Sequence, residues 1–141
     1  MARVENPQSF TYRSGKVVQT NRTTSALLAR LTRLPVSDVV ISSITLAELE
    51  YGLHRNGQPP RLRAALTQVL LRLDVLPWDD KVATCYGEVC STLEARGINL
   101  SDFDMMIATH AIAVGTTLVS RDKTFAKVAK VMAPRLNLEV W

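Results

Sequence analysis

Four acidic residues stand just beyond predicted strands or at the start of a predicted helix. Glu48 and Asp122 each follow a short β-rich run, and Asp102 and Asp104 open an apolar helix. Carboxylates ~4 Å apart repel one another by about 4 kcal/mol at an effective dielectric of 20. A cluster of them is stable only where protons or a cation neutralise the charge. Oxygen ligands with open coordination positions favour Mg²⁺ or Mn²⁺, which can lower the pKa of bound water and hold a phosphodiester.

Each acid also has a simpler structural explanation. Acids in the first turn of a helix, such as Asp102 and Asp104, interact favourably with the helix dipole and with free N–H groups. Glu48 alone suits a solvated helix face, and Asp122 alone suits a turn. The combination of all four near one edge of a sheet is what favours a functional site.

The elements that must position these acids are strands that alternate with helical segments. The predicted strands cover residues 39–42, 74–77, 117–120 and 138–141, with 16–19 as a weaker fifth. Apolar residues recur at helical spacing between them. This order predicts an α/β fold with a mostly parallel sheet and helices on both faces. In such sheets the functional crevice lies beyond the carboxyl ends of the strands.

Capping residues predict where the two acid-bearing helices begin. Thr45 is expected to cap the first, which would place Glu48 in its first turn and turn Glu50 elsewhere. Ser101 with Asp104 forms a start similar to a capping box, with aspartate in place of the usual glutamate. That second helix, 102–114, is apolar almost all round, so we expect it to be buried. Its histidine, His110, is interpreted as a core residue rather than a catalyst.

Length and composition indicate one intracellular domain. The chain has 141 residues, of which 47% are hydrophobic, and no apolar run approaches the ~20 residues of a membrane span. Residues 1–15 are polar and contain no apolar core of a secretion signal, so a cytoplasmic location is expected. The two cysteines, Cys85 and Cys90, are interpreted as reduced core thiols.

Positive charge is concentrated at the N-terminal end. Residues 1–37 contain six basic residues and one acid, a net charge of +5, within a chain whose net charge is +4. Such an end suits contact with phosphates or with an acidic partner, and it equally suits a solvated leader. We interpret residues 1–15 as a basic leader that is either disordered or not native to the protein, and residues 16–141 as the folded domain.

Several segments, in this order, resemble the PIN-domain ribonucleases, and most closely the VapC toxins of bacterial toxin–antitoxin pairs. The segments are SSITLAELEYG (42–52), LDVLP (73–77), FDMMIATHA (103–111), LVSRD (118–122) and the terminal Trp141. The resemblance implies a PIN-like three-layer α/β/α domain and an endoribonuclease that depends on Mg²⁺ or Mn²⁺. Such toxins typically cut RNA, often tRNA, form homodimers and are held inactive by a cognate antitoxin.

The resemblance also implies roles for individual residues. Glu48 matches the glutamate of the family's T-x-x-E-x-x-x-G segment, Asp104 the aspartate before Met-Ile-Ala, and Asp122 the acidic or amide position after the fourth strand. In the family these positions bind the metal directly or through water. Ser120 matches a hydroxyl position beside the site and is expected to orient water or phosphate.

One position departs from the family pattern. The family's first strand ends in a metal-binding aspartate followed by Thr-Asn, whereas this chain has Gln19 before Thr20-Asn21. Glutamine supplies a neutral oxygen, so metal affinity should fall sharply. The sequence therefore predicts either a ribonuclease of weak or absent activity or an altered N-terminal region.

Two other functional classes compete with a ribonuclease. The missing acid and the basic leader are compatible with a catalytically inactive PIN-like module that binds an antitoxin or RNA. A domain of the response-regulator type also gathers acids at a sheet edge, but it requires its lysine on a later strand than its phosphoacceptor. Asp122 and Lys123 are adjacent here, which disfavours that class.

Overall fold

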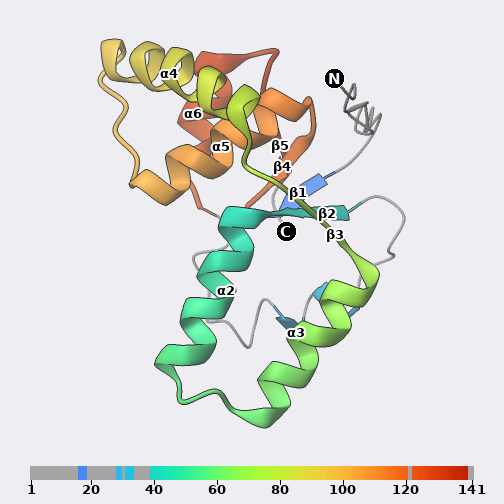
Figure 1. Cartoon of the computed structure of the whole chain (residues 1–141). Helices are drawn as coiled ribbons and strands as arrows, with labels where there is room; N and C mark the ends of the chain where they lie inside the picture. Colours follow the sequence, from blue (N-terminus) through green and yellow to red (C-terminus); the bar gives the residue numbers. More distant parts are fainter. Residues whose placement is uncertain (1–15, 19–27, 30, 34–38, 121, 140–141) are drawn as a thin grey trace, which may run out of the picture.

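The computed structural model describes residues 16–18, 28–29, 31–33, 39–120 and 122–139. Within them lies one five-stranded sheet, ordered β3-β2-β1-β4-β5 (Figure 1). Every neighbouring pair of strands is parallel. The strands are β1 (Lys16–Val18), β2 (Val39–Ser42), β3 (Asp74–Leu76), β4 (Thr117–Val119) and β5 (Asn137–Glu139). The α/β fold predicted from the sequence is confirmed, including the weak first strand, which is the central one.

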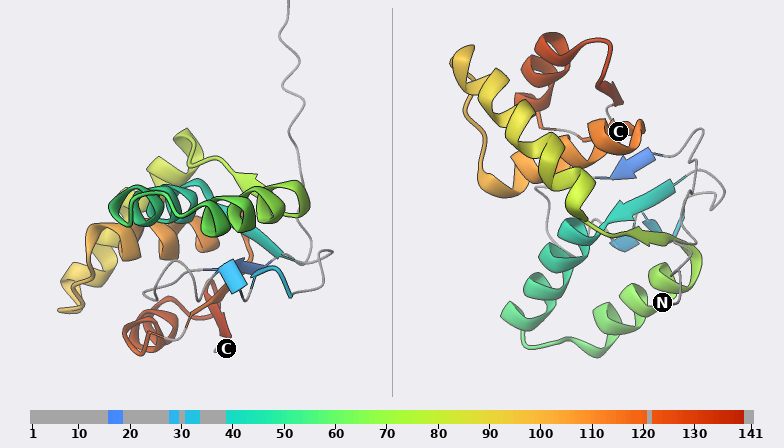
Figure 2. Two further views of the ribbon diagram at one scale, coloured as in Figure 1. Left: turned by 90° about the horizontal axis from the view of Figure 1, so that it is seen from below. Right: turned by 45° about the horizontal axis from the view of Figure 1, so that its top comes forward.

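Helices connect the strands. They are α2 (Ser43–Arg55), α3 (Pro60–Arg72), α4 (Asp80–Ala95), α5 (Asp102–Val114) and α6 (Thr124–Met132). α2 and α3 form a hairpin that projects beyond the β3 side of the sheet, whereas α6 lies near β5 (Figures 1 and 2). α5 ends at Gly115, whose φ of 67° is the left-handed conformation that glycine adopts without strain.

Two apolar clusters cover opposite faces of the sheet. Successive strand residues point to opposite faces, so Val40 belongs to one cluster and Ile41 to the other. The Val40 cluster takes its helical residues from α4, α5 and α6, including the fully buried Phe125. The Ile41 cluster takes them from α2 and α3 and also includes Leu28 and Leu31. Helices on both faces make the predicted three-layer architecture.

The predicted start of α2 is wrong. The helix begins at Ser43 and is capped by Ser42, whose hydroxyl accepts a hydrogen bond from the Ile44 N–H. Thr45 is a buried residue inside the first turn, and Glu48 consequently falls in the second turn. Ser42, Ser43 and Thr45 can all serve as caps, so local preference does not choose among them. The pairing of β2 with β3 extends to Ser42, and the helix begins directly after it.

Other predictions have mixed outcomes. The range of α5 and its capping residue Ser101 are confirmed. The leader 1–15, Gln19 and Trp141 lie outside the described residues. Cys85 and Cys90 are free and only partly buried, at the margin of the core rather than within it. No helix in the described part of the chain is long and apolar enough to cross a membrane.

Candidate functional site

Glu48 carries a carboxylate oxygen that is buried in the folded chain. Its Oε2 atom is buried and has no hydrogen-bond partner among the residues that the structure describes. Burial, and next the negative charge of Asp104, raise the pKa of Glu48 from 4.5 to about 7. Burial therefore disfavours the charged form of Glu48, and no hydrogen-bond donor from the described residues stabilises Oε2.

Asp104 is brought near Glu48 by the N-terminus of α5. The Ser101 hydroxyl accepts a hydrogen bond from the Asp104 N–H and donates one to Asp104 Oδ2, at 2.7 Å. This differs from a capping box, in which the side chain at this position would accept from the backbone N–H of the cap residue. The Asp104 carboxylate is thus held by the residue that caps its own helix, and its charge acts on the Glu48 carboxylate of α2.

Asp122 and Ser120 lie at the carboxyl end of β4. Ser120 is buried, and its backbone N–H donates to the Glu139 carbonyl while its hydroxyl accepts from the Asp122 N–H. Asp122 Oδ1 accepts from the Thr124 N–H at 2.8 Å, at the start of α6. β4 and β2 flank the central strand β1 on its two sides. Ser120 and Asp122 therefore follow the carboxyl end of one flanking strand, and α2 follows the carboxyl end of the other.

Among the described residues, the charge of Asp104 acts on Glu48 and raises its pKa. Across the described ranges, no three histidine, cysteine, aspartate or glutamate side chains form a group that could hold a metal ion by themselves. Gln19, which follows the central strand in the sequence, is not among the described residues. The structure thus brings Glu48 close enough to Asp104 for the two charges to interact, and roles in a metal site for Glu48, Asp104 and Asp122 remain predictions from sequence.

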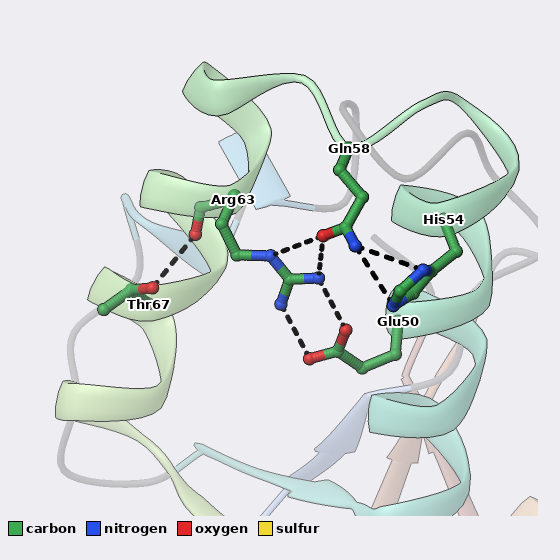
Figure 3. Close-up of polar contacts among 5 residues, drawn as sticks. All are labelled: Glu50, His54, Gln58, Arg63 and Thr67. Carbon is green, nitrogen blue, oxygen red and sulfur yellow. Dashed lines mark hydrogen bonds and ion pairs between the residues drawn. The ribbon is translucent and has the colours of Figure 1, made fainter.

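Glu50, two residues after Glu48, is turned away from this pair, as expected. Its carboxylate accepts two hydrogen bonds from Arg63, at 2.9 and 2.8 Å (Figure 3). Gln58 also accepts from Arg63 and contacts the ring of His54. This group ties α2 to α3, and the Arg63 hydrogen bonds lower the pKa of Glu50.

Comparison with known proteins decides the family. The PIN domain family matches residues 17–131 of this chain. The chain belongs to the PIN-domain family. Ribonuclease VapC2 of Rickettsia felis is 36% identical to it over 104 residues, which cover 73% of this chain and 74% of the relative. The tRNA(fMet)-specific endonuclease VapC of Salmonella typhimurium is 33% identical over 109 residues, covering 77% and 79% of the two chains.

Solved structures agree with this assignment. The crystal structure of VapBC2 from Rickettsia felis bound to a DNA fragment from its promoter superposes with a TM-score of 0.74 at 30% identity, covering 89% of this chain and 98% of that one. DNA-bound VapBC from Salmonella typhimurium gives a TM-score of 0.73 at 27% identity, covering 90% and 98%. The three-layer PIN fold expected from the sequence is therefore confirmed.

In a PIN domain, the donor set seen here suits a hard divalent cation. Glu48 Oε2 is a buried oxygen without a partner in the described chain, and the neighbouring Asp104 adds negative charge. Carboxylate oxygens are the ligands that Mg²⁺ and Mn²⁺ prefer. A cation between these groups would replace the missing donor and favour the ionised form of Glu48.

Two supporting residues of this PIN domain were not predicted from sequence. Ser42 Oγ and His110 Nδ1 lie 2.7 Å apart in the core, which joins the start of α2 to α5. Trp78 donates from its backbone N–H to Ser43 Oγ and from its indole N–H to the Met106 carbonyl. The contact of Ser42 with His110 and the two hydrogen bonds of Trp78 thus each link α2, which carries Glu48, to α5, which carries Asp104. His110 is buried, as predicted.

Proposed function

We propose that this chain is a divalent-metal-dependent endoribonuclease of the VapC toxin type, restrained by a cognate antitoxin protein. The observation that carries the proposal is the Glu48–Asp104 pair, a buried carboxylate with an unsatisfied oxygen beside a second acid. The relatives named ribonuclease and tRNA-specific endonuclease support the same chemistry. RNA, with tRNA as the first candidate, is the proposed substrate.

Glu48 and Asp104 would hold Mg²⁺ or Mn²⁺, with Asp122 reaching the site from the end of β4. When bound, such an ion supplies an acidified water and stabilises charge on a phosphodiester. Because the pKa of Glu48 is raised to about 7, binding of a cation there would release a proton from Glu48 near neutral pH. Ser120, held by its bond to the Asp122 N–H, keeps a hydroxyl beside this acid that can orient water or phosphate.

RNA cleavage by purified protein tests the proposal. Bulk bacterial tRNA is incubated with the wild type in Mn²⁺, in Mg²⁺ and in EDTA, and the products are separated by gel electrophoresis. Glu48→Gln and Asp104→Asn should each lower the rate by about 100-fold or more, since loss of an outer-shell partner alone typically costs 10–100-fold. EDTA should abolish cleavage.

Matched controls lie beside each acid. Glu50→Gln changes an acid two residues from Glu48 that bonds to Arg63, and Asp102→Asn changes an exposed acid in the same helical turn as Asp104. Both should retain at least half of the wild-type rate. Equal activity of Glu48→Gln and Glu50→Gln, or cleavage that persists in EDTA, would contradict the proposed site.

A second candidate function is a PIN-like module that binds an antitoxin or RNA without cutting it. The presence of Gln19, where the family pattern has a metal-binding aspartate, favours this alternative. No cleavage at high protein and Mn²⁺ concentrations, together with a stable antitoxin complex, would select it. Detectable cleavage that requires Glu48 would reject it.

The proposed partners are an antitoxin and a second copy of this chain. The matched VapBC structures are complexes, so co-expression of this chain with candidate antitoxins tests antitoxin binding directly. Light scattering during size-exclusion chromatography measures the mass of the isolated protein. A mass that corresponds to one copy of this chain per particle, both alone and in the antitoxin complex, would contradict the proposed homodimer.

A further inference from the structure

An apolar pocket opens directly beside the Glu48–Asp104 pair. It has a volume of about 540 Å³ and is lined by Ala47, Glu48, Tyr51 and Phe103. Such a volume is within the range of ordinary small-ligand sites. The pocket shares Glu48 with the proposed metal site, so any molecule bound there touches both.

The two aromatic residues of this pocket are exposed, and each lies within three positions of one of the two acids in the sequence. Tyr51 follows Glu48 by three residues on α2, which places both on one side of the helix, and Phe103 immediately precedes Asp104 on α5. Tyr51 is 67% exposed and Phe103 is 52% exposed. The other two exposed large hydrophobic residues of the described chain, Leu70 and Leu71, lie on α3. The exposed aromatic side chains of the described residues therefore lie beside Glu48 and Asp104.

We propose that Tyr51 and Phe103 bind a nucleobase of the RNA substrate by stacking, next to the phosphate that Glu48 and Asp104 act on. The proposal rests on the proposed ribonuclease function and names two substrate-binding residues for it. Unstacked bases of single-stranded RNA bind preferentially on aromatic side chains, and such stacking tolerates any base.

Charge explains why stacking is needed here. Two adjacent carboxylates repel the phosphate backbone of RNA, and a bound cation offsets this repulsion only locally. Aromatic faces add affinity without adding charge, so they can hold a nucleotide beside an acidic centre. An apolar peptide fits less well, because one of the four lining residues is the acid Glu48.

The test measures RNA affinity and cleavage in aromatic variants. Tyr51→Ala and Phe103→Ala should each raise KM for a short single-stranded RNA by about 5- to 100-fold, the usual loss for one stacked base. The kcat should fall much less. Tyr51→Phe and Phe103→Tyr keep the aromatic face and should keep the wild-type KM. Leu71→Ala removes a still more exposed hydrophobic residue on α3 and serves as the control.

Binding without cleavage separates this inference from the proposed function. RNA that carries the fluorescent base 2-aminopurine is titrated with Asp104→Asn protein, and stacking quenches its fluorescence. Quenching that disappears in the Tyr51→Ala and Phe103→Ala backgrounds supports the stacking site even if the wild type cuts no RNA. Unchanged KM and unchanged quenching in both alanine variants would overturn it, as would loss of antitoxin binding with RNA affinity intact.

Discussion

Ser42 Oγ lies 2.7 Å from His110 Nδ1, in a fully buried contact between residues 68 positions apart in the sequence. The same hydroxyl caps α2 by accepting from the Ile44 N–H. One side chain thus fixes where α2 begins and how it meets α5. The relative position of Glu48 and Asp104 depends on this junction, because each belongs to one of the two helices.

Removing the Ser42 hydroxyl should therefore destabilise the fold. Ser42→Ala deletes a helix cap and leaves the buried imidazole nitrogen without its partner, so the free energy of unfolding should fall by about 2–4 kcal/mol. Urea denaturation followed by circular dichroism measures the change. Ser91→Ala, at an exposed position of α4, should change it by less than about 0.5 kcal/mol. Equal stability of the two variants would contradict the structural role of this junction.

His110 should make the protein sensitive to acid. Burial lowers the pKa of His110 to about 4, although the charge of Asp79 opposes this shift. The unfolded chain takes up this proton near pH 6.5 and the folded chain only near pH 4. Stability is therefore complete above pH 6.5 and decreases as the pH falls, by up to about 3 kcal/mol at pH 4.

The raised pKa of Glu48 acts in the opposite direction, since the folded state then binds the proton more tightly. Urea denaturation between pH 4 and 8 should accordingly compare Glu48→Gln with Glu48→Gln/His110→Gln. The acid-dependent loss should be present in the first variant and absent in the second. His54→Gln, at an exposed position, is the control. An identical pH profile in both Glu48 variants would show that His110 is not the sensor.

Glu48→Gln should stabilise the metal-free protein while removing its response to metal. The substitution puts a neutral amide in place of a carboxylate near Asp104 whose buried Oε2 has no hydrogen-bond partner among the described residues. In EDTA at pH 8 we expect Tm to rise by roughly 2–4 °C, as for a gain of about 1 kcal/mol. Mn²⁺ should raise Tm of the wild type but not of the variant.

Differential scanning fluorimetry measures both effects. Glu50→Gln is the matched control, and it should lose a little stability because its bonds to Arg63 weaken, while keeping the Mn²⁺ response. If the wild type showed no Tm shift at millimolar Mn²⁺, metal binding by Glu48 and Asp104 would be refuted.

Gln19→Asp should strengthen the metal site. The residue follows the central strand in the sequence, where the family pattern has an aspartate, and a charged oxygen binds Mg²⁺ better than an amide oxygen. Calorimetry should show tighter Mg²⁺ binding by about 10- to 100-fold, and RNA cleavage should accelerate. Gln68→Asp adds the same charge at an exposed position of α3 and should change neither. No gain in Mg²⁺ affinity would show that Gln19 does not occupy the family's metal-binding position.

Sequence alone determined the elements and their order. The range of α5 could be predicted because its cap, Ser101, and its apolar composition both act locally, and β2 because its β-rich run has clear ends. The order of strands and helices then implied a parallel sheet with the acids near one edge. The start of α2 was predicted wrongly because three neighbouring residues have similar capping preferences.

Tertiary structure decided what surrounds each acid. The sequence could not show that Glu48 is buried beside Asp104, that Ser42 bonds to His110, or that Tyr51 and Phe103 line one pocket. Local propensity and periodicity act over a few residues, whereas each of these contacts joins two residues that are more than 50 positions apart in the sequence. Their energies depend on desolvation and charge in the folded chain, which exist only once both helices have packed on the sheet.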